Sequence, residues 1–199
     1  MTKVTINFFT FVVFTSCMVN LSYATTQNPT TSTWAETKSY GQGQGHERKT
    51  VLQFYFHDIR TAVGDEPTTA SLIAQPIQGI NNFTSGFGNL YMVDDPLTLT
   101  PDRNSKLVGR AQGFYGSASQ EVVNFVTGLT YGFVDGIYNG SSLVIFGSNP
   151  ITNPVRELPV VGGTGVFRMA RGYAIARTYF HNNTLHNAIV GYNVTVFHA

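Results

Sequence analysis

The chain has few of the residues from which several common kinds of functional site are built. Cysteine occurs once in 199 residues, as Cys17, and charged residues make up only 12% of the chain. A single cysteine excludes an intramolecular disulfide and a metal site built from several thiolates. Lysine and arginine number 12 against 11 acidic residues. The chain therefore lacks the basic excess of a nucleic-acid-binding protein, and we expect no nucleic-acid partner.

The first 24 residues have the composition of a signal peptide. Lys3 precedes an apolar segment at residues 6–19, and small residues follow at Ser22 and Ala24, as at a signal-peptidase site. Polar residues interrupt the segment, whereas a membrane-spanning helix needs about 20 predominantly apolar residues. We therefore expect cleavage after residue 24 and secretion of a mature chain without Cys17. We expect no membrane association of that chain, because it has no second such segment.

Two further features fit a secreted chain. Residues 25–49 are polar and have no apolar periodicity, so they predict a flexible leader in which only Trp34 is suited to docking on a core. Four Asn-X-Ser/Thr sequons in the expected mature chain predict N-glycosylation at exposed positions. The sequons begin at Asn82, Asn139, Asn182 and Asn193.

From residue 50 onward, apolar and polar residues alternate with the period of a β-strand. In residues 51–59, VLQFYFHDI, this alternation places Leu52, Phe54, Phe56 and Asp58 on one face. Turn-forming stretches separate this run from seven others, and helical periodicity is almost absent. The eight predicted strands lie within residues 51–59, 68–77, 88–99, 107–115, 122–133, 141–147, 167–180 and 186–199. The pattern predicts one all-β domain at residues 50–199, an antiparallel barrel or sandwich.

The glycine cluster GGTG at residues 162–165 resembles a nucleotide-binding turn only superficially. A Rossmann site needs a third glycine, a following helix and a later acidic residue. Here Arg168 is near the position of the third glycine, a strand-like alternation follows, and no acidic residue occurs after Glu157. We interpret the cluster as a sharp connection between strands, where a positive φ favours glycine.

Asp58 is the first candidate for chemistry, because it ends the face formed by Leu52, Phe54 and Phe56. A buried aspartate either pairs with a donor and supports the structure, or has a raised pKa suited to proton transfer. The residues alone leave both interpretations open. His57 has the opposite parity and is expected at the surface or at an interface.

Other polar residues give weaker signals. Asp94 and Asp95 precede Pro96, which favours a structural turn with the two side chains on opposite faces over a carboxylate dyad. His181 and His186 flank a predicted hairpin turn with no third ligand nearby, so we do not expect a metal site. The nucleophile motif of serine hydrolases, Gly-X-Ser-X-Gly, is absent.

Five motifs in the same order resemble those of the plant dirigent protein family and together span residues 50–199. They are FYFHDI (54–59), FGNLYMVDDPLT (87–98), VGRAQGFY (108–115), VIFGSNP (144–150) and VRELPVVGGTGVFRMARGYA (155–174). The resemblance implies an eight-stranded antiparallel β-barrel, usually a homotrimer, secreted to the apoplast or cell wall. It also implies a phenolic small-molecule substrate and no metal or organic cofactor.

The resemblance implies a role in phenylpropanoid chemistry. Its best-known members bind phenoxy radicals made by a separate laccase or peroxidase and direct their coupling to one stereoisomer of a lignan, without oxidising the substrate. Others close a ring through a quinone methide, as in pterocarpan formation. We expect the first role, and keep two alternatives: a cofactor-free cyclase or dehydratase acting on a flavonoid-type phenol, and a non-catalytic cell-wall or defence protein.

The site residues implied by the resemblance are those at positions that match its motifs. Asp58, Tyr115 and Arg156 match the acid, the phenol and the cation of the family's pocket. Phe54 and Phe56 are expected to form its aromatic wall. From the residues alone, Tyr115 fits core packing as well as it fits hydrogen bonding to a phenol.

At two positions this sequence differs from the family members that form pinoresinol. Asn149 stands where they have a second aspartate, and Ser117 stands where they have a second tyrosine. Asparagine can hydrogen-bond a phenolic oxygen but cannot exchange a proton at neutral pH. We therefore expect a site with a single carboxylate, Asp58, in which Asn149 binds the substrate.

Overall fold

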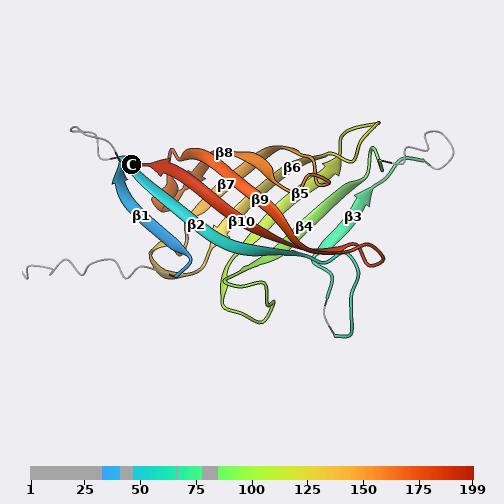
Figure 1. Ribbon diagram of the computed structural model, residues 1–199, viewed down its shortest axis with the longest axis horizontal. Helices are drawn as coiled ribbons and strands as arrows, with labels where there is room; N and C mark the ends of the chain where they lie inside the picture. Colours follow the sequence, from blue (N-terminus) through green and yellow to red (C-terminus); the bar gives the residue numbers. More distant parts are fainter. Residues whose placement is uncertain (1–32, 41–46, 66, 78–84) are drawn as a thin grey trace, which may run out of the picture. The chain divides into compact units, whose positions relative to one another are not determined.

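The chain folds into a closed antiparallel β-barrel (Figure 1). The computed structural model describes residues 33–40, 47–65, 67–77 and 85–199, and only two single-turn 3-10 helices accompany the strands there. Ten strands form one sheet in the order β1-β2-β10-β9-β8-β7-β6-β5-β4-β3, and an additional β2–β4 pairing closes it. Eight strands thus make the barrel, with β1 and β3 flanking its seam, which confirms the predicted fold class.

The bounds of the elements follow the chain. The elements are β1 (Ala35–Tyr40), β2 (Glu47–Asp58), β3 (Ala70–Ala74), β4 (Leu90–Thr98), β5 (Leu107–Ser117), β6 (Phe125–Phe133), η1 (Gly136–Tyr138), β7 (Ser142–Asn149), β8 (Arg156–Thr164), η2 (Gly165–Phe167), β9 (Arg171–Asn182) and β10 (Asn187–His198). No helix of the described segments is long and apolar enough to cross a membrane.

The seam is short. β2 and β4 pair only at Tyr55 with Thr98 and at Phe56 with Leu97. The first half of β2 pairs instead with β1, and the first half of β4 pairs with β3. β1 and β3 therefore extend the seam at opposite ends of the barrel (Figure 1).

The core confirms the side-chain alternation predicted for β2. Leu52, Phe54 and Phe56 are 0%, 1% and 6% exposed, and they face the barrel interior with the inward residues of the other strands. Burying a large apolar side chain of this kind stabilises the fold by about 1.5–3 kcal/mol. Because the chain has a single cysteine and so no internal disulfide, this apolar core is what stabilises the fold.

The expectation of a flexible leader is wrong for residues 33–40. Residues 35–40 form β1, and Trp34 is buried at one end of the barrel against Phe133 and Tyr138, with ring centroids 5.4 and 5.5 Å away. The Trp34 Nε1–H also donates to Asp135 Oδ2 at 2.7 Å. Polar composition misled the prediction because β1 is an edge strand, whose outward side chains are solvated while its backbone pairs with β2.

The glycine cluster was only partly predicted. Gly162 and Gly163 lie within β8, a strand that the alternation did not reveal, whereas Gly165 has a φ of +60° and begins η2. A Cβ on Gly163 would approach the Phe167 and Ser142 carbonyl oxygens to 2.6 Å. The glycines therefore allow η2 to fold back onto the end of β8.

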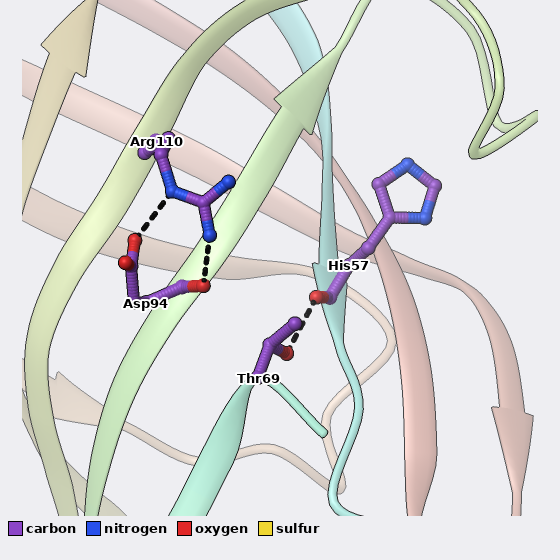
Figure 2. Close-up of polar contacts among 4 residues, drawn as sticks. All are labelled: His57, Thr69, Asp94 and Arg110. Atoms are coloured by element: carbon purple, nitrogen blue, oxygen red, sulfur yellow. Dashed lines mark hydrogen bonds and ion pairs between the residues drawn. The ribbon is translucent and has the colours of Figure 1, made fainter. Parts of the chain in front are cut away.

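His57 is buried, contrary to the expected surface position. It is 1% exposed, and its Nε2 lies 2.7 Å from Thr98 Oγ1 across the seam. The Thr69 hydroxyl, just before β3, donates to the His57 carbonyl oxygen at 3.3 Å, and the imidazole points away from Asp94 and Arg110 (Figure 2). The segments that flank the seam cover the outer face here, which the parity of a single strand does not predict.

We predict that Trp34→Ala lowers the free energy of unfolding by about 3–5 kcal/mol, because it removes a buried aromatic side chain from the end of the barrel. Trp34→Phe keeps most of this packing and should cost much less, chiefly the hydrogen bond to Asp135. Urea unfolding of the three proteins measures both values. A loss below about 1 kcal/mol for Trp34→Ala would mean that β1 contributes little to the stability of the barrel.

Candidate functional site

A cavity opens at the end of the barrel opposite the Trp34 cluster. Its volume is about 250 Å³. β2, β5, β7 and β9 end there and β6, β8 and β10 begin there, so each strand contributes its terminal inward residues. The apolar and aromatic residues of the lining are Phe56, Tyr115, Phe125, Leu129, Ile151, Pro154, Ala188, Val190 and Tyr192. Such walls suit a flat aromatic ligand.

A stack of three aromatic rings positions the acid of this cavity. Tyr115 on β5 lies between Tyr91 and Phe125, with ring centroids 5.2 and 5.1 Å away and ring planes inclined by 29° and 9°. Its hydroxyl donates to Asp58 Oδ2 at 2.8 Å. Tyr115 is therefore both a packing residue and a hydrogen-bond donor, the two roles that the residues alone left open.

The environment of Asp58 favours proton exchange near neutrality. Burial raises the pKa of its carboxyl to about 6, against the opposing effects of the Tyr115 hydrogen bond and the Arg60 charge. Burial and the nearby Asp58 also raise the pKa of Tyr115, which stays a neutral donor. Asp58 Oδ1 has no hydrogen-bond partner in the described part of the protein. That oxygen is free to accept a proton from a ligand or give one to it.

Three other polar side chains that line the cavity have atoms without a partner in the described residues. These atoms are Thr127 Oγ1, Asn149 Oδ1 and Arg156 Nε, and each is fully buried. Buried polar groups in proteins are normally hydrogen-bonded, so a cluster of exceptions is typical of a binding site. Arg156 does donate through Nη1 to the Asn153 carbonyl oxygen at 3.1 Å and to Thr178 Oγ1 at 2.9 Å, which fixes its head group.

The structure brings most of the predicted site residues together. Asp58, Tyr115, Asn149, Arg156 and Phe56 all line the cavity. The exception is Phe54, which lies two residues before Phe56 on β2 and deeper in the core.

Phe54 packs on Tyr131 and Tyr192, with ring centroids 5.4 and 5.9 Å apart, and it does not line this cavity. Phe54 contacts Tyr192, which does line the cavity, and its expected role in binding substrate stays a prediction.

His181 and His186 also line the cavity, at the hairpin that joins β9 to β10. Among the described residues, no three His, Cys, Asp or Glu side chains are placed to hold a metal ion. Ser117, at the position of the second tyrosine, is buried but is not part of the lining.

The sequence prediction missed a second buried carboxyl. Asp94, Asp95 and Pro96 lie inside β4 rather than in a turn, although the two aspartates do face opposite sides as expected. Asp94 is exposed and accepts from Arg110 Nε at 2.6 Å on the outer face (Figure 2). Asp95 is 0% exposed, and neither of its carboxyl oxygens forms a hydrogen bond within the described residues.

Asp95 is held in its protonated form at neutral pH. Burial and the negative charge of Asp58 raise its pKa to about 9. The nearby Thr69 hydroxyl opposes this rise in pKa. That hydroxyl accepts a hydrogen bond from the Ile59 amide and donates one to the His57 carbonyl oxygen, so it does not satisfy the Asp95 carboxyl. Asp95 has the same parity along β4 as Val93 and Leu97, which are both buried. This parity was the signal in the sequence that could have placed Asp95 inside the barrel.

These shifts predict a dependence of stability on pH. The folded Asp95 stays protonated up to about pH 9, whereas the same side chain in the unfolded chain ionises near pH 4. The folded state therefore holds the extra proton, and the free energy of unfolding falls as the pH rises, by at most about 1.4 kcal/mol per pH unit.

Asp95→Asn removes this proton exchange, so it should gain stability relative to the wild type between pH 5 and pH 8. Urea unfolding at several pH values measures the difference. Asp94→Asn, which changes the neighbouring exposed carboxyl, is the matched control and should follow the wild-type slope. Parallel slopes for the wild type and Asp95→Asn would show that Asp95 is ionised in the folded protein.

Comparison with known proteins finds relatives that match the whole barrel. The family model described as "Dirigent-like protein" matches residues 49–197. Dirigent protein 23 of Arabidopsis thaliana is 50% identical over 156 residues, which cover 77% of this chain and 80% of that protein. Pterocarpan synthase 1 of Glycyrrhiza echinata is 46% identical over 157 residues, covering 78% of this chain and 81% of that one.

A solved pterocarpan synthase dirigent protein has the same fold. It superposes with a TM-score of 0.70 at 44% sequence identity and covers 80% of this chain and 89% of its own. The match of the family model over the whole barrel and the identity to several relatives lead to one conclusion: the chain belongs to the dirigent protein family.

Proposed function

We propose that this protein binds phenoxy radicals or quinone methides of phenylpropanoids in the open end of its barrel and imparts stereoselectivity to their coupling or ring closure. It does not itself oxidise the phenol. Membership of the dirigent family supports a small phenolic substrate.

One observation supports this proposal above the others. The cavity combines aromatic walls with four buried polar side chains that each have an atom lacking a protein partner in the described segments. These residues are Asp58, Thr127, Asn149 and Arg156. A phenolic ligand would stack on the walls and supply the missing partners, so its orientation would be fixed by several polar contacts at once. Fixing two reacting faces in one geometry selects a stereoisomer with little further chemistry by the protein.

Each polar residue has a chemical role in this proposal. Asp58, held by Tyr115, exchanges the proton that a quinone methide gains or a phenol loses. The Arg156 guanidinium stabilises negative charge on the substrate oxygen. Asn149 accepts a hydrogen bond from a phenolic hydroxyl but exchanges no proton.

A second function is favoured by Asn149 and by the identity to pterocarpan synthases. With a single carboxyl in direct reach of the ligand, the site suits protonation of one intermediate better than proton transfer at both halves of a dimeric intermediate. We therefore keep a cofactor-free ring closure or dehydration of a flavonoid-type phenol as the alternative. A non-catalytic cell-wall or defence role is the third possibility that the test below covers.

The cellular context is also part of the proposal. We propose that residues 1–24 direct secretion to the apoplast or cell wall, that a laccase or peroxidase supplies the radicals, and that the barrel forms a homotrimer. For glycosylation, Asn139 is exposed beside η1, whereas Asn182 and Asn193 are partly buried on β9 and β10. Asn82 lies outside the described residues.

We predict that the mature protein gives an enantiomeric excess when a laccase oxidises coniferyl alcohol, measured by chiral chromatography of the coupled products. Asp58→Asn should abolish this excess, since the amide keeps the shape of the side chain but cannot exchange a proton. Asp94→Asn, with its carboxyl on the outer face, is the control and should behave as the wild type.

A racemic product at saturating protein would reject guidance of lignan coupling. The same proteins are then assayed with an isoflavanol and no oxidase. Ring closure that Asp58→Asn slows by about 10²–10⁴-fold would establish the cyclase. Failure of both assays would leave the non-catalytic role.

A further inference from the structure

Arg60 is a charged residue of the cavity lining to which the proposed function gives no role. It follows the end of β2 and is half-buried at the open end of the barrel, whereas Arg156 is buried at the start of β8. Asp58 is the only carboxyl among the described residues that line the cavity. The lining therefore carries two permanent positive charges, and Asp58 offsets at most one of them. A cavity with this balance of charge favours a ligand that carries a negative charge.

Contacts of both its backbone and its side chain hold Arg60 in place. The amides of Arg60 and Thr61 donate to Asn187 Oδ1, each at 3.0 Å, and Asn187 Nδ2 donates to the Thr61 carbonyl oxygen at 2.9 Å. The guanidinium carbon lies 4.0 Å from the centre of the Tyr91 ring, and Nη2 donates to the Tyr91 hydroxyl. Arg60 is thus positioned before a ligand arrives, so binding costs less side-chain entropy than it would for a mobile arginine.

No carboxylate of the described residues forms an ion pair with Arg60 or Arg156. The recorded ion pairs lie elsewhere and join Glu36 to Lys38, Asp135 to Lys106, Asp94 to Arg110 and Glu47 to Arg171. The Arg60 charge acts on Asp58, but Asp58 Oδ2 accepts its hydrogen bond from Tyr115. Arg156 is 3% exposed, and its Nε has no partner in the described segments. Both guanidiniums therefore keep N–H donors for a ligand, in the planar arrangement that suits a carboxylate.

The two guanidiniums belong to opposite walls of the barrel. Around the closed sheet the strands run β2-β10-β9-β8-β7-β6-β5-β4, so β4 and β8 are four strands apart in either direction. The Arg60 head group lies on Tyr91 of β4, and Arg156 begins β8. Aromatic and apolar side chains complete the lining. A ligand that reaches both guanidiniums is therefore elongated, with oxygen atoms at its two ends and a flat apolar middle.

We propose that the cavity takes a phenol that also carries a carboxylate, with the carboxylate bound by Arg60 and the phenolic end directed toward Arg156 and Asn149. This inference rests on the proposed function and names the class of substrate within it. A hydroxycinnamate has this shape, because its phenol and its carboxylate stand at opposite ends of one planar, conjugated skeleton. The negative charge of the ligand also favours the protonated form of Asp58, so the site keeps its acid when the substrate is bound.

The first test measures binding and needs no reaction. Ferulate carries the carboxylate, and methyl ferulate has the same phenol and skeleton without the charge. In calorimetric titrations of the mature protein at pH 7 and low ionic strength, ferulate should bind about tenfold more tightly than its ester, as expected for one charge-assisted contact. Raising the salt concentration to about 1 M should reduce this preference, because Arg60 is accessible to screening ions.

Arg60→Gln tests the residue itself, because glutamine keeps a polar side chain without the charge. In this variant the ratio of the two affinities should fall to about one, whereas Arg60→Lys, which keeps the charge, should retain part of the preference. Arg110→Gln removes an arginine from the outer face and is the matched control, with the wild-type ratio expected. The inference is overturned if the wild type fails to bind ferulate, if it binds both ligands equally, or if the preference survives in Arg60→Gln.

The second test separates this inference from the proposed function. With a laccase as oxidant, the wild type should give an enantiomeric excess with ferulate, and Arg60→Gln should lower this excess more than the excess obtained with coniferyl alcohol. An excess with coniferyl alcohol but none with ferulate would leave the proposed function standing and overturn the assignment of the substrate. Ferulate binding that depends on Arg60, without an excess for either phenol, would support the carboxylate site and reject stereoselective coupling.

Discussion

Closure of the barrel depends on the short contact between β2 and β4. Two register pairs join these strands, so the rest of each edge is satisfied by β1 or by β3. Unpaired strand edges expose backbone donors and acceptors and invite association with other chains. β1 is therefore part of the closure, although its sequence is as polar as a linker. The same shortness of the seam leaves room for Thr69, just before β3, to hydrogen-bond to Ile59 on one side and to Asp94 on the other.

The two ends of the barrel have opposite physical roles. At one end, Trp34, Phe133, Tyr138 and Phe167 pack edge-to-face and in stacks, and the polar groups among them are hydrogen-bonded. At the other end, aromatic walls surround polar atoms that have no partner among the described residues. Leaving such atoms unsatisfied costs stability, and the well-packed end can offset it. This division is typical of proteins in which a functional site departs from local rules.

The sequence predicted what depends on alternation along one strand and missed what depends on its neighbours. The inward stripe ending at Asp58 and the opposite faces of Asp94 and Asp95 follow from the period of two. The burial of His57 does not, because it requires knowing which segments cover the seam, whereas the inward position of Asp95 was available from its parity with Val93 and Leu97. Tyr115, Asn149 and Arg156 were found through their motifs. No rule of spacing would have shown that three separate strands bring them to one cavity.

Asn149 and Arg156 line the same cavity, and Asn149 brings no negative charge to it. In the described part of the chain Arg156 donates to two neutral acceptors, and burial lowers its pKa without removing the charge. A carboxylate at position 149 would be a negative partner on the same cavity wall. With an amide there, and with Asp95 protonated, Asp58 is the only carboxyl among the described residues of the site that ionises near neutrality. A substrate oxygen that gains negative charge as the reaction proceeds would then be the counter-ion of Arg156. Such an interaction is stronger in the transition state than in the bound substrate, which is the condition for it to accelerate a step.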